Sequence, residues 1–196
     1  SSAEDIIFTI PQSIYLNKGY VYILNKYKFT KNLNFTKSVL IEKDVESLWK
    51  NIRKSYKSPI NKGLREQKFV FIDSDNLNYE SFKSIEKFHY EISGRKTRSS
   101  KTWELQYSLI KNDKSFAVLS YDKENDNLNC AVYFYKSKIH AFYGTGIFSD
   151  YAKKKLYAYS IIWQAILYCQ RRNITICELD ENVRFKWMNN IDKKLI

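Results

Sequence analysis

A chain of 196 residues is long enough to form one substantial domain with its own core. Its formal net charge of +12 favours an anionic partner: a nucleic acid, a nucleotide, a phosphorylated sugar or a membrane surface. Heavy use of lysine, asparagine, isoleucine and tyrosine, as in AT-rich genomes, is the alternative source of that charge. No apolar run reaches about 18 residues, so no membrane insertion is expected. The three cysteines lack Cys-x-x-Cys spacing and lie in apolar segments, which predicts reduced, packed thiols in a cytoplasmic protein.

The N-terminal segment does not look self-contained. Residues 5–10 read as a strand that Pro11 stops, and residues 14–27 as a helix. We expect residues 1–36 to be the tail of a preceding domain or an N-terminal extension, and residues 37–196 to form the main domain. The chain is therefore expected to be a processed protein or a fragment of a longer one.

The next segment combines a strand, a helix and a group of cations. Residues 38–41 predict the strand, Asp44 is suited to cap the following helix, and apolar residues recur at helical spacing over residues 45–56. We expect the helix to break at Ser58-Pro59, where a kinked pair of helices could turn several cations toward one anion. A solvated face is the alternative. The candidate anion-binding residues here are Lys57, Asn61 and Lys62.

A second polar segment follows residues 68–73, which predict a strand. The next helix is expected to begin after Asn78, to place Ile92 on its inner side and to end at Gly94. The loop over residues 94–101 is the most polar in the chain. In it, Arg95 and Arg98 could each bind a phosphate or carboxylate through two hydrogen bonds, and a solvated loop is the alternative.

The rest of the chain predicts alternating helices and strands. Helices are expected over residues 102–111 and 152–172, strands over residues 116–121, 128–136, 138–143 and 174–180, and a hairpin turn over residues 122–127. Gly144-Thr145-Gly146 stands before the second helix and resembles a phosphate-binding turn. The expected fold class is α/β (α+β), with a mixed, mostly antiparallel sheet flanked by helices.

Few side chains offer chemistry. His89 and His140 have no cysteine or carboxylate at ligand spacing, so we expect structural histidines and no metal. The acid–base candidates are the carboxylates at one strand end, Glu178, Asp180 and Glu181, and tyrosines such as Tyr143 and Tyr151. A strand cap or a salt bridge is the alternative for the acids. The candidate catalytic residues are Tyr143, Glu178 and Asp180, and the candidate substrate-binding residues are Lys57, Asn61, Lys62, Arg95, Arg98, Thr145 and Tyr151.

The order and spacing of the segments at 45–62, 88–95, 143–146, 162–166 and 177–180 resemble the FemAB family, which is built from GNAT-type acyltransferase folds. The resemblance covers about residues 38–181, and it implies that the chain holds the end of the first family domain and most of the second. It implies transfer of an acyl or aminoacyl group to an amine of a cell-wall precursor or a surface-polysaccharide sugar. The donor substrate would be acyl-CoA or aminoacyl-tRNA, no cofactor would stay bound, and a phosphorylated sugar, a cell-wall precursor and tRNA would be the partners.

The resemblance also implies roles for residues. Lys57, Asn61 and Lys62 match the basic segment at the start of the second family domain, Arg95 matches an arginine after the long helix, and Tyr143 matches a strand-end tyrosine that faces the substrate cleft. Arg95 and Lys62 would then bind phosphate, Tyr143 would orient the substrate, and Glu178 or Asp180 would accept a proton. The family's glycine-rich Phe-Lys segment has only a loose counterpart in residues 184–186.

The implied mechanism is direct attack of the amine on an activated carbonyl, with no covalent enzyme intermediate. Positioning of the two substrates can lower such a barrier by about 7–11 kcal/mol at best, and backbone N–H groups and cations would stabilise the oxyanion and the phosphates. The alternative is a non-catalytic RNA- or polysaccharide-binding module with a degenerate acyltransferase fold, whose tyrosines stack on bases or sugars. An enzyme needs its cations around a cleft, whereas such a module needs them on one continuous face.

Overall fold

The computed structural model of the protein describes residue 26 and residues 37–179, and the latter belong to one compact unit. Apart from Lys26, the strand expected at 5–10 and the helix expected at 14–27 lie outside the described residues, as do Asp180 and residues 184–186. The division at residue 36 stays a prediction.

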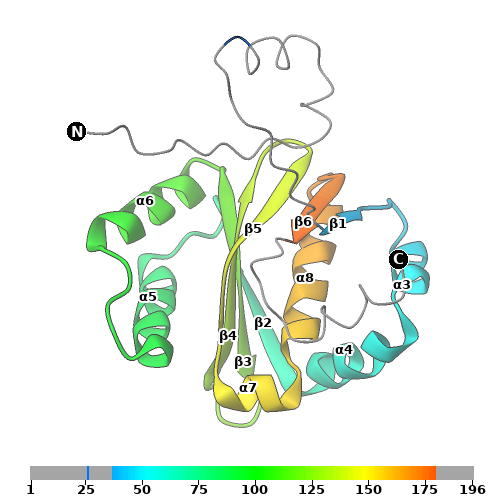
Figure 1. Cartoon of the computed structure of the whole chain (residues 1–196), viewed down its shortest axis with the longest axis horizontal. Coiled ribbons are helices and arrows are strands. Elements are labelled where there is room, and N and C mark those ends of the chain that lie inside the picture. Colours follow the sequence, from blue (N-terminus) through cyan, green and yellow to red (C-terminus); the bar gives the residue numbers. More distant parts are fainter. Residues whose placement is uncertain (1–25, 27–36, 180–196) are drawn as a thin grey trace. The chain divides into compact units, whose positions relative to one another are not determined.

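One mixed sheet forms the centre of this unit, with its six described strands in the order β1-β6-β5-β4-β3-β2 (Figure 1). The strands are β1 Lys37–Leu40, β2 Gln67–Ile72, β3 Ser115–Asp122, β4 Leu128–Lys136, β5 His140–Phe148 and β6 Ile176–Leu179. Every neighbouring pair is antiparallel except β5 and β6, which are parallel. A parallel pair needs a crossover, and two helices between the strands supply it. The predicted mixed, mostly antiparallel sheet is confirmed.

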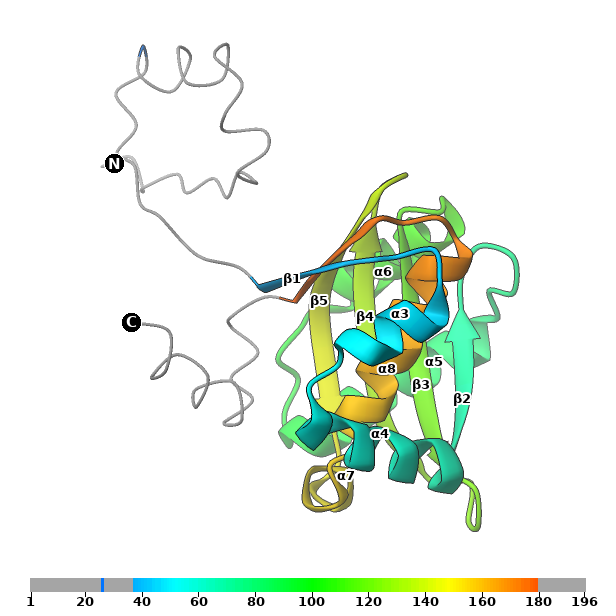
Figure 2. The same cartoon turned by 90° about the vertical axis from the view of Figure 1, so that its right-hand side faces the viewer.

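Helices cover both faces of the sheet (Figures 1 and 2). The helices are α3 Val45–Asn51, α4 Lys54–Glu66, α5 Tyr79–Ser93, α6 Ser100–Lys111, α7 Asp150–Lys155 and α8 Ala158–Arg171. Helices α3, α4 and α8 lie on one face, α5 and α6 lie on the other, and α7 lies at the end of β5. No helix in the described ranges is long and apolar enough to span a bilayer.

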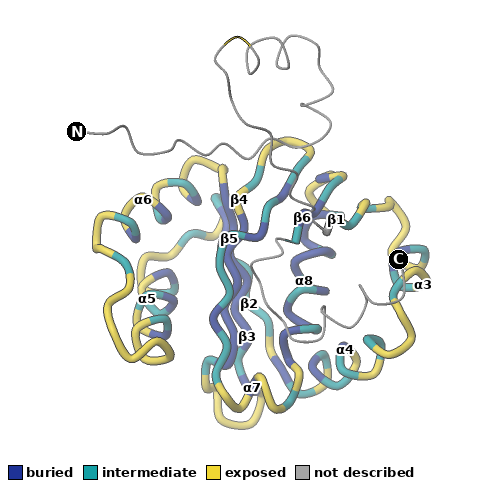
Figure 3. Tube along the Cα trace, viewed as in Figure 1, coloured by how far each residue is buried: buried dark blue, intermediate teal, exposed yellow. Residues whose placement is uncertain are grey.

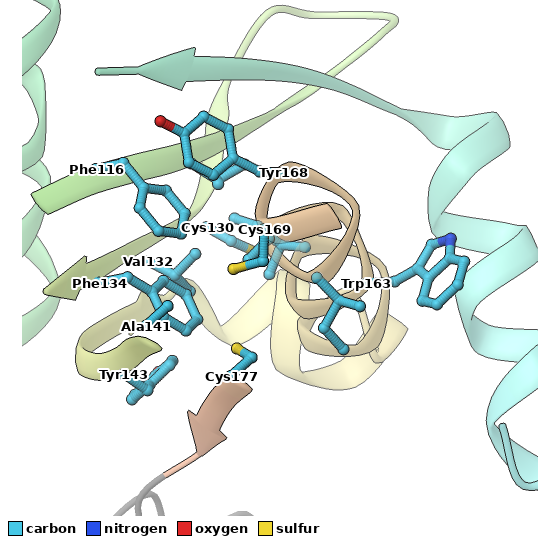
Figure 4. Close-up of a cluster of buried hydrophobic side chains, with 14 of the residues drawn as sticks. Phe116, Cys130, Val132, Phe134, Ala141, Tyr143, Trp163, Tyr168, Cys169 and Cys177 are labelled. Atoms are coloured by element: carbon cyan, nitrogen blue, oxygen red, sulfur yellow. The ribbon is translucent and has the colours of Figure 1, made fainter. Parts of the chain in front are cut away.

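Two cores result, because successive strand residues point to opposite faces. Phe116 and Val118 of β3 pack toward α8, whereas Ala117 and Leu119 pack toward α5 and α6. Figure 3 shows the buried residues concentrated along the central strands and α8. The core around α8 is rich in aromatic rings: Phe116 lies 5.1 Å from Phe134 and 4.1 Å from Tyr168, measured between centroids (Figure 4). All three cysteines are buried and free, as expected.

The predicted helix ends are largely confirmed. The Asp44 carboxylate accepts hydrogen bonds from the backbone N–H groups of Glu46 and Ser47, at 3.1 and 2.8 Å. Asn78 caps α5 through the N–H of Ser81, and Gly94 ends it with φ of +65°. These signals are local, because a short polar side chain or a glycine satisfies the end of a helix without help from the rest of the fold.

Three local expectations are wrong. The helix does not break at Ser58-Pro59: extended backbone at Ile52 ends α3, and Pro59 lies inside α4. Burial of Ile60 and Gly63 against α8 holds α4 together where the proline removes one hydrogen bond. The helix expected over 152–172 is divided into α7 and α8 by Leu156, whose φ is +63°. Ile92 is 40% exposed, so it does not lie on the inner side of α5.

Candidate functional site

Gly144-Thr145-Gly146 lies inside β5, so the expected phosphate-binding turn is wrong. Packing explains the two glycines. A Cβ atom at Gly144 would lie 2.5 Å from the ring of Tyr135, and one at Gly146 would overlap the hydroxyl of Tyr143. The two glycines therefore leave room for aromatic rings to lie across β5. They do not form a turn before a helix.

Gly144 is the extra residue of a β-bulge. Tyr133 of β4 lies opposite Thr145, and the next residue, Phe134, lies opposite Tyr143, so nothing on β4 faces Gly144. The bulge reverses the alternation of β5: Tyr143 packs in the core around α8, whereas Ile147 packs in the core under α5 and α6. Thr145 consequently lies on the α5 and α6 side of the sheet, where its hydroxyl meets Arg98.

A pocket of about 830 Å³ opens on that side of the sheet, lined by α5, the loop over residues 94–99 and the start of α6. Its lining contains five cations, Lys83, Lys87, Arg95, Lys96 and Arg98, and two carboxylates, Glu80 and Glu86. Lys83 forms an ion pair with Glu86 at 2.7 Å. Arg95, Lys96 and Arg98 have no carboxylate at ion-pair distance within the described part of the chain. The pocket therefore has excess positive charge and suits an anion.

Arg98 joins this pocket to the sheet. Its Nη2 donates a hydrogen bond of 2.8 Å to the hydroxyl of Thr145, and its guanidinium carbon lies 5.6 Å from the centre of the Trp103 ring. These contacts hold a half-buried cation in place beside β5. The structure thus brings together the predicted residues Arg98 and Thr145, with Arg95 in the lining of the same pocket.

His89 also lines the pocket, although the sequence suggested only a structural histidine. It is half-buried on α5, and its ring meets Trp103 edge to face at 5.4 Å. Burial lowers the pKa of His89, and the nearby charge of Arg98 lowers it further. The imidazole is therefore neutral at neutral pH and can accept a proton. The sequence did not indicate that His89 and the polar loop line the same pocket.

The predicted cations of α4 lie elsewhere. Lys57, Asn61 and Lys62 belong to the helix on the opposite face of the sheet (Figure 2). Lys57 lies 5.5 Å from the centre of the Trp49 ring, a contact within its own helical layer. Lys62 and Arg95, the two residues expected to bind phosphate, lie on opposite faces of the sheet, so they do not meet at a single phosphate. The error came from assuming a helix break that would turn the α4 cations toward the substrate.

The candidate catalytic residues do not meet in the pocket. Tyr143 lies within β5, not at a strand end; it is 4% exposed, and burial raises the pKa of its phenol. Glu178 is 8% exposed, with Oε2 3.0 Å from Nε2 of His140. That distance fits an ion pair, although the angles are not those of a hydrogen bond. Tyr151 is 48% exposed on α7.

The pair of His140 and Glu178 could not be found in the sequence. The residues lie 38 positions apart on β5 and β6 and become neighbours only through the parallel pairing of these strands. The contact with His140, which is an ion pair when the imidazole is protonated, is of the kind considered as the alternative role for Glu178. No group of three or more histidine, cysteine, aspartate or glutamate side chains that could hold a metal occurs among residues 37–179.

Comparison with solved structures defines the type of fold. No protein-family model matches the sequence, and no curated protein sequence matches it. FemX is similar with a TM-score of 0.66 and 12% identity, covering 90% of this chain and 64% of its own. The L-PGS protein from Bacillus licheniformis has a TM-score of 0.60 and 12% identity, covering 83% of this chain and 49% of its own.

A third similar structure is the C-terminal domain of a putative lysylphosphatidylglycerol synthetase from Agrobacterium fabrum, with a TM-score of 0.51 and 10% identity. The match covers 74% of this chain and 48% of that one. The chain therefore spans between about half and two-thirds of the length of these proteins. The chain has a FemAB-like, GNAT-type acyltransferase fold, and the resemblance seen in the sequence is confirmed at the level of the fold.

Proposed function

We propose that this chain is the domain of a cytoplasmic transferase that moves an acyl or aminoacyl group to an amine. The fold shared with FemX and with a protein named as a lysylphosphatidylglycerol synthetase supports this reaction class. The observation that carries the proposal is the hydrogen bond from Arg98 to Thr145, which places a cationic pocket directly beside β5. In a transferase, the site for charged substrate groups must lie next to backbone N–H groups that can bind a carbonyl oxygen.

The open edge of β5 can contribute to that chemistry. Strand β6 pairs only with residues 140–142 of β5, so from Tyr143 onward the edge turned away from β4 has no strand partner among the described residues. Unpaired backbone N–H groups on a fixed strand can donate hydrogen bonds to a carbonyl oxygen as negative charge develops on it. The bulge at Gly144 lies within this open segment and fixes where those groups point.

The proposed reaction is direct attack of an acceptor amine on the carbonyl carbon of the donor. The donor is acyl-CoA or aminoacyl-tRNA, and the acceptor is an amine of a cell-wall precursor, a surface-polysaccharide sugar or another phosphorylated compound. Arg95, Lys96 and Arg98 hold a phosphate or carboxylate of one substrate, which fixes the approach of the reacting atoms. Tyr143 and Glu178 are enclosed, and we assign them to support of β5 and β6 rather than to contact with substrate.

Calorimetric titration with coenzyme A and acetyl-CoA tests the donor, with ATP as the control for simple attraction of phosphates to a basic surface. Selective, saturable binding of the CoA compounds indicates an acyl-CoA transferase. If ATP binds as tightly as the CoA compounds, aminoacyl-tRNA becomes the proposed donor. The reaction itself is tested by mass spectrometry of glucosamine 6-phosphate incubated with the protein and either acetyl-CoA or lysyl-tRNA.

Two charge variants test the pocket. Arg98→Gln removes a pocket cation, whereas Lys54→Gln removes an exposed cation on the opposite face of the sheet. We expect Arg98→Gln to weaken binding of the anionic substrate at least 10-fold and Lys54→Gln to leave it within about 2-fold, since one charge-assisted hydrogen bond contributes about 1.5–3 kcal/mol. Equal effects of the two variants, or no acyl transfer from either donor, would contradict the proposal and favour a non-catalytic binding module.

A further inference from the structure

The strongest group left without a role is the imidazole of His89 in the cationic pocket. His89 sits at the border between the buried face of α5, which carries Ile85 and Phe88, and the pocket. Its ring is held edge to face against Trp103, at 5.4 Å, and no hydrogen bond to another described residue occupies its nitrogens. An oriented imidazole without a protein partner is available to a bound molecule.

The charges around His89 come from two elements. Helix α5 contributes Glu80, Lys83, Glu86, Lys87 and the phenol of Tyr90, and the following loop contributes Arg95, Lys96 and Arg98. Ser99 at the end of the loop, and Ser100 and Trp103 at the start of α6, carry no charge at neutral pH. Since the cations outnumber the carboxylates, the pocket disfavours a second positive charge on His89 and on any amine bound beside it.

We infer that the pocket binds the acceptor, an amine that also carries a phosphate or carboxylate, and that His89 is the base that takes the proton of that amine. Arg95 and Arg98 hold the anionic group, and the same positive field favours the uncharged, nucleophilic form of the amine. This inference rests on the proposed function. It adds which of the two substrates lies in the pocket and which residue moves the proton.

The step balances without another reactant. The amine nitrogen forms a bond to the donor carbonyl carbon, and its N–H becomes acidic as that bond forms. The proton passes to a ring nitrogen of His89 while the bond from the carbonyl carbon to the leaving oxygen or sulfur breaks. The leaving atom then recovers the proton from the imidazolium, which restores neutral His89. The lowered pKa of His89, caused by burial and by Arg98, keeps this base unprotonated between turnovers.

The test compares His89→Gln and His89→Ala with the wild-type chain, using glucosamine 6-phosphate as the acceptor probe and the donor that supports turnover. We expect kcat to fall by about 100-fold or more in both variants, while KM for the acceptor stays within about 3-fold. Added imidazole should restore part of the activity of His89→Ala. Urea unfolding of each variant checks that the fold persists.

Two further measurements separate the base from a structural role. The wild-type rate should rise with pH through an apparent pKa below about 6.5, the ordinary value for histidine, and this step should be absent in His89→Gln. Glucosamine, which lacks the phosphate, should react with a much higher KM. Unchanged kcat in a folded His89→Gln variant that retains the wild-type pH profile overturns the inference alone. Absence of any transfer by the wild-type chain overturns the inference together with the proposed function.

Discussion

Replacing Gly63 with alanine should destabilise this unit, because α4 and α8 touch at that residue. Gly63 is buried, and a Cβ atom added there would overlap Oγ of Ser160 and lie 2.5 Å from Cβ of Ser160. Ser160 is fully buried, and its hydroxyl donates a 2.8 Å hydrogen bond to the carbonyl of Tyr157, so it cannot swing away freely. The two helices must separate to admit the methyl group.

Two opposing terms set the expected magnitude. Alanine is favoured over glycine inside a helix by about 1 kcal/mol, whereas overpacking a closed contact costs about 1–3 kcal/mol. Because the new atom would meet both the Cβ and the hydroxyl of Ser160, we expect the upper part of that range and a net loss of about 1–2 kcal/mol. Urea unfolding followed by circular dichroism measures this as a lower midpoint at unchanged m-value.

The double variant Gly63→Ala with Ser160→Gly is the control. Removing the Ser160 side chain removes the overlap, so alanine at residue 63 should then be neutral or stabilising, and the two changes should couple by at least about 1 kcal/mol. A higher midpoint for Gly63→Ala alone, or the same loss with and without Ser160, would refute the argument that this contact requires glycine.

Three other predictions concern polar side chains. Arg172 donates to the carboxylates of Asp73 and Asp75, so Arg172→Met should lower the free energy of unfolding by about 1–3 kcal/mol in urea titrations. Burial alone would raise the pKa of Asp73, but hydrogen bonds from Arg172 and Tyr168 and the charge of Arg172 hold it below its ordinary value. The ionised Asp73 therefore stabilises the folded state above the unfolded-state pKa of about 3.9, and this stabilisation is lost as the pH falls through the lower folded-state pKa. In Asp73→Asn, the fall of the urea unfolding midpoint that this loss causes at acid pH should be absent. The Tyr143 hydroxyl is buried without a hydrogen-bond partner among the described residues, so Tyr143→Phe should leave the melting temperature unchanged. Turnover should also be unchanged if this tyrosine only supports β5. A large fall in turnover would show that Tyr143 belongs to the active site.

Local signals in the sequence were sufficient for most of the fold. Asp44, Asn78 and Gly94 mark helix ends through their own side chains or backbone freedom, and runs of β-branched and aromatic residues mark the strands. The break expected near Pro59 failed because burial of α4 against α8 outweighs the hydrogen bond that proline removes. That burial depends on residues about 100 positions away, which no local pattern contains.

The residues of the candidate site were likewise predicted from the sequence only in part. The density of cations in the loop over residues 94–101 indicated Arg95 and Arg98, and both line the pocket. Thr145 was selected as part of a turn that does not exist, and it meets Arg98 only because the bulge at Gly144 changes the direction of its side chain. His89 gave no signal, because nothing in the sequence indicated that α5 and the loop over residues 94–99 line one pocket.

The pairing of β1 with β6 has a consequence for how the chain folds. These are the first and last described strands of the sheet, and Lys37 lies opposite Leu179. During synthesis, neither β1 nor this edge of β5 has a strand partner until the ribosome has added α7, α8 and then β6. Contacts of such long sequence separation form slowly, and an unpaired strand edge can meanwhile join another chain. The nascent chain therefore leaves residues 140–142 of β5 as an unpaired, aggregation-prone strand edge until β6 has been made.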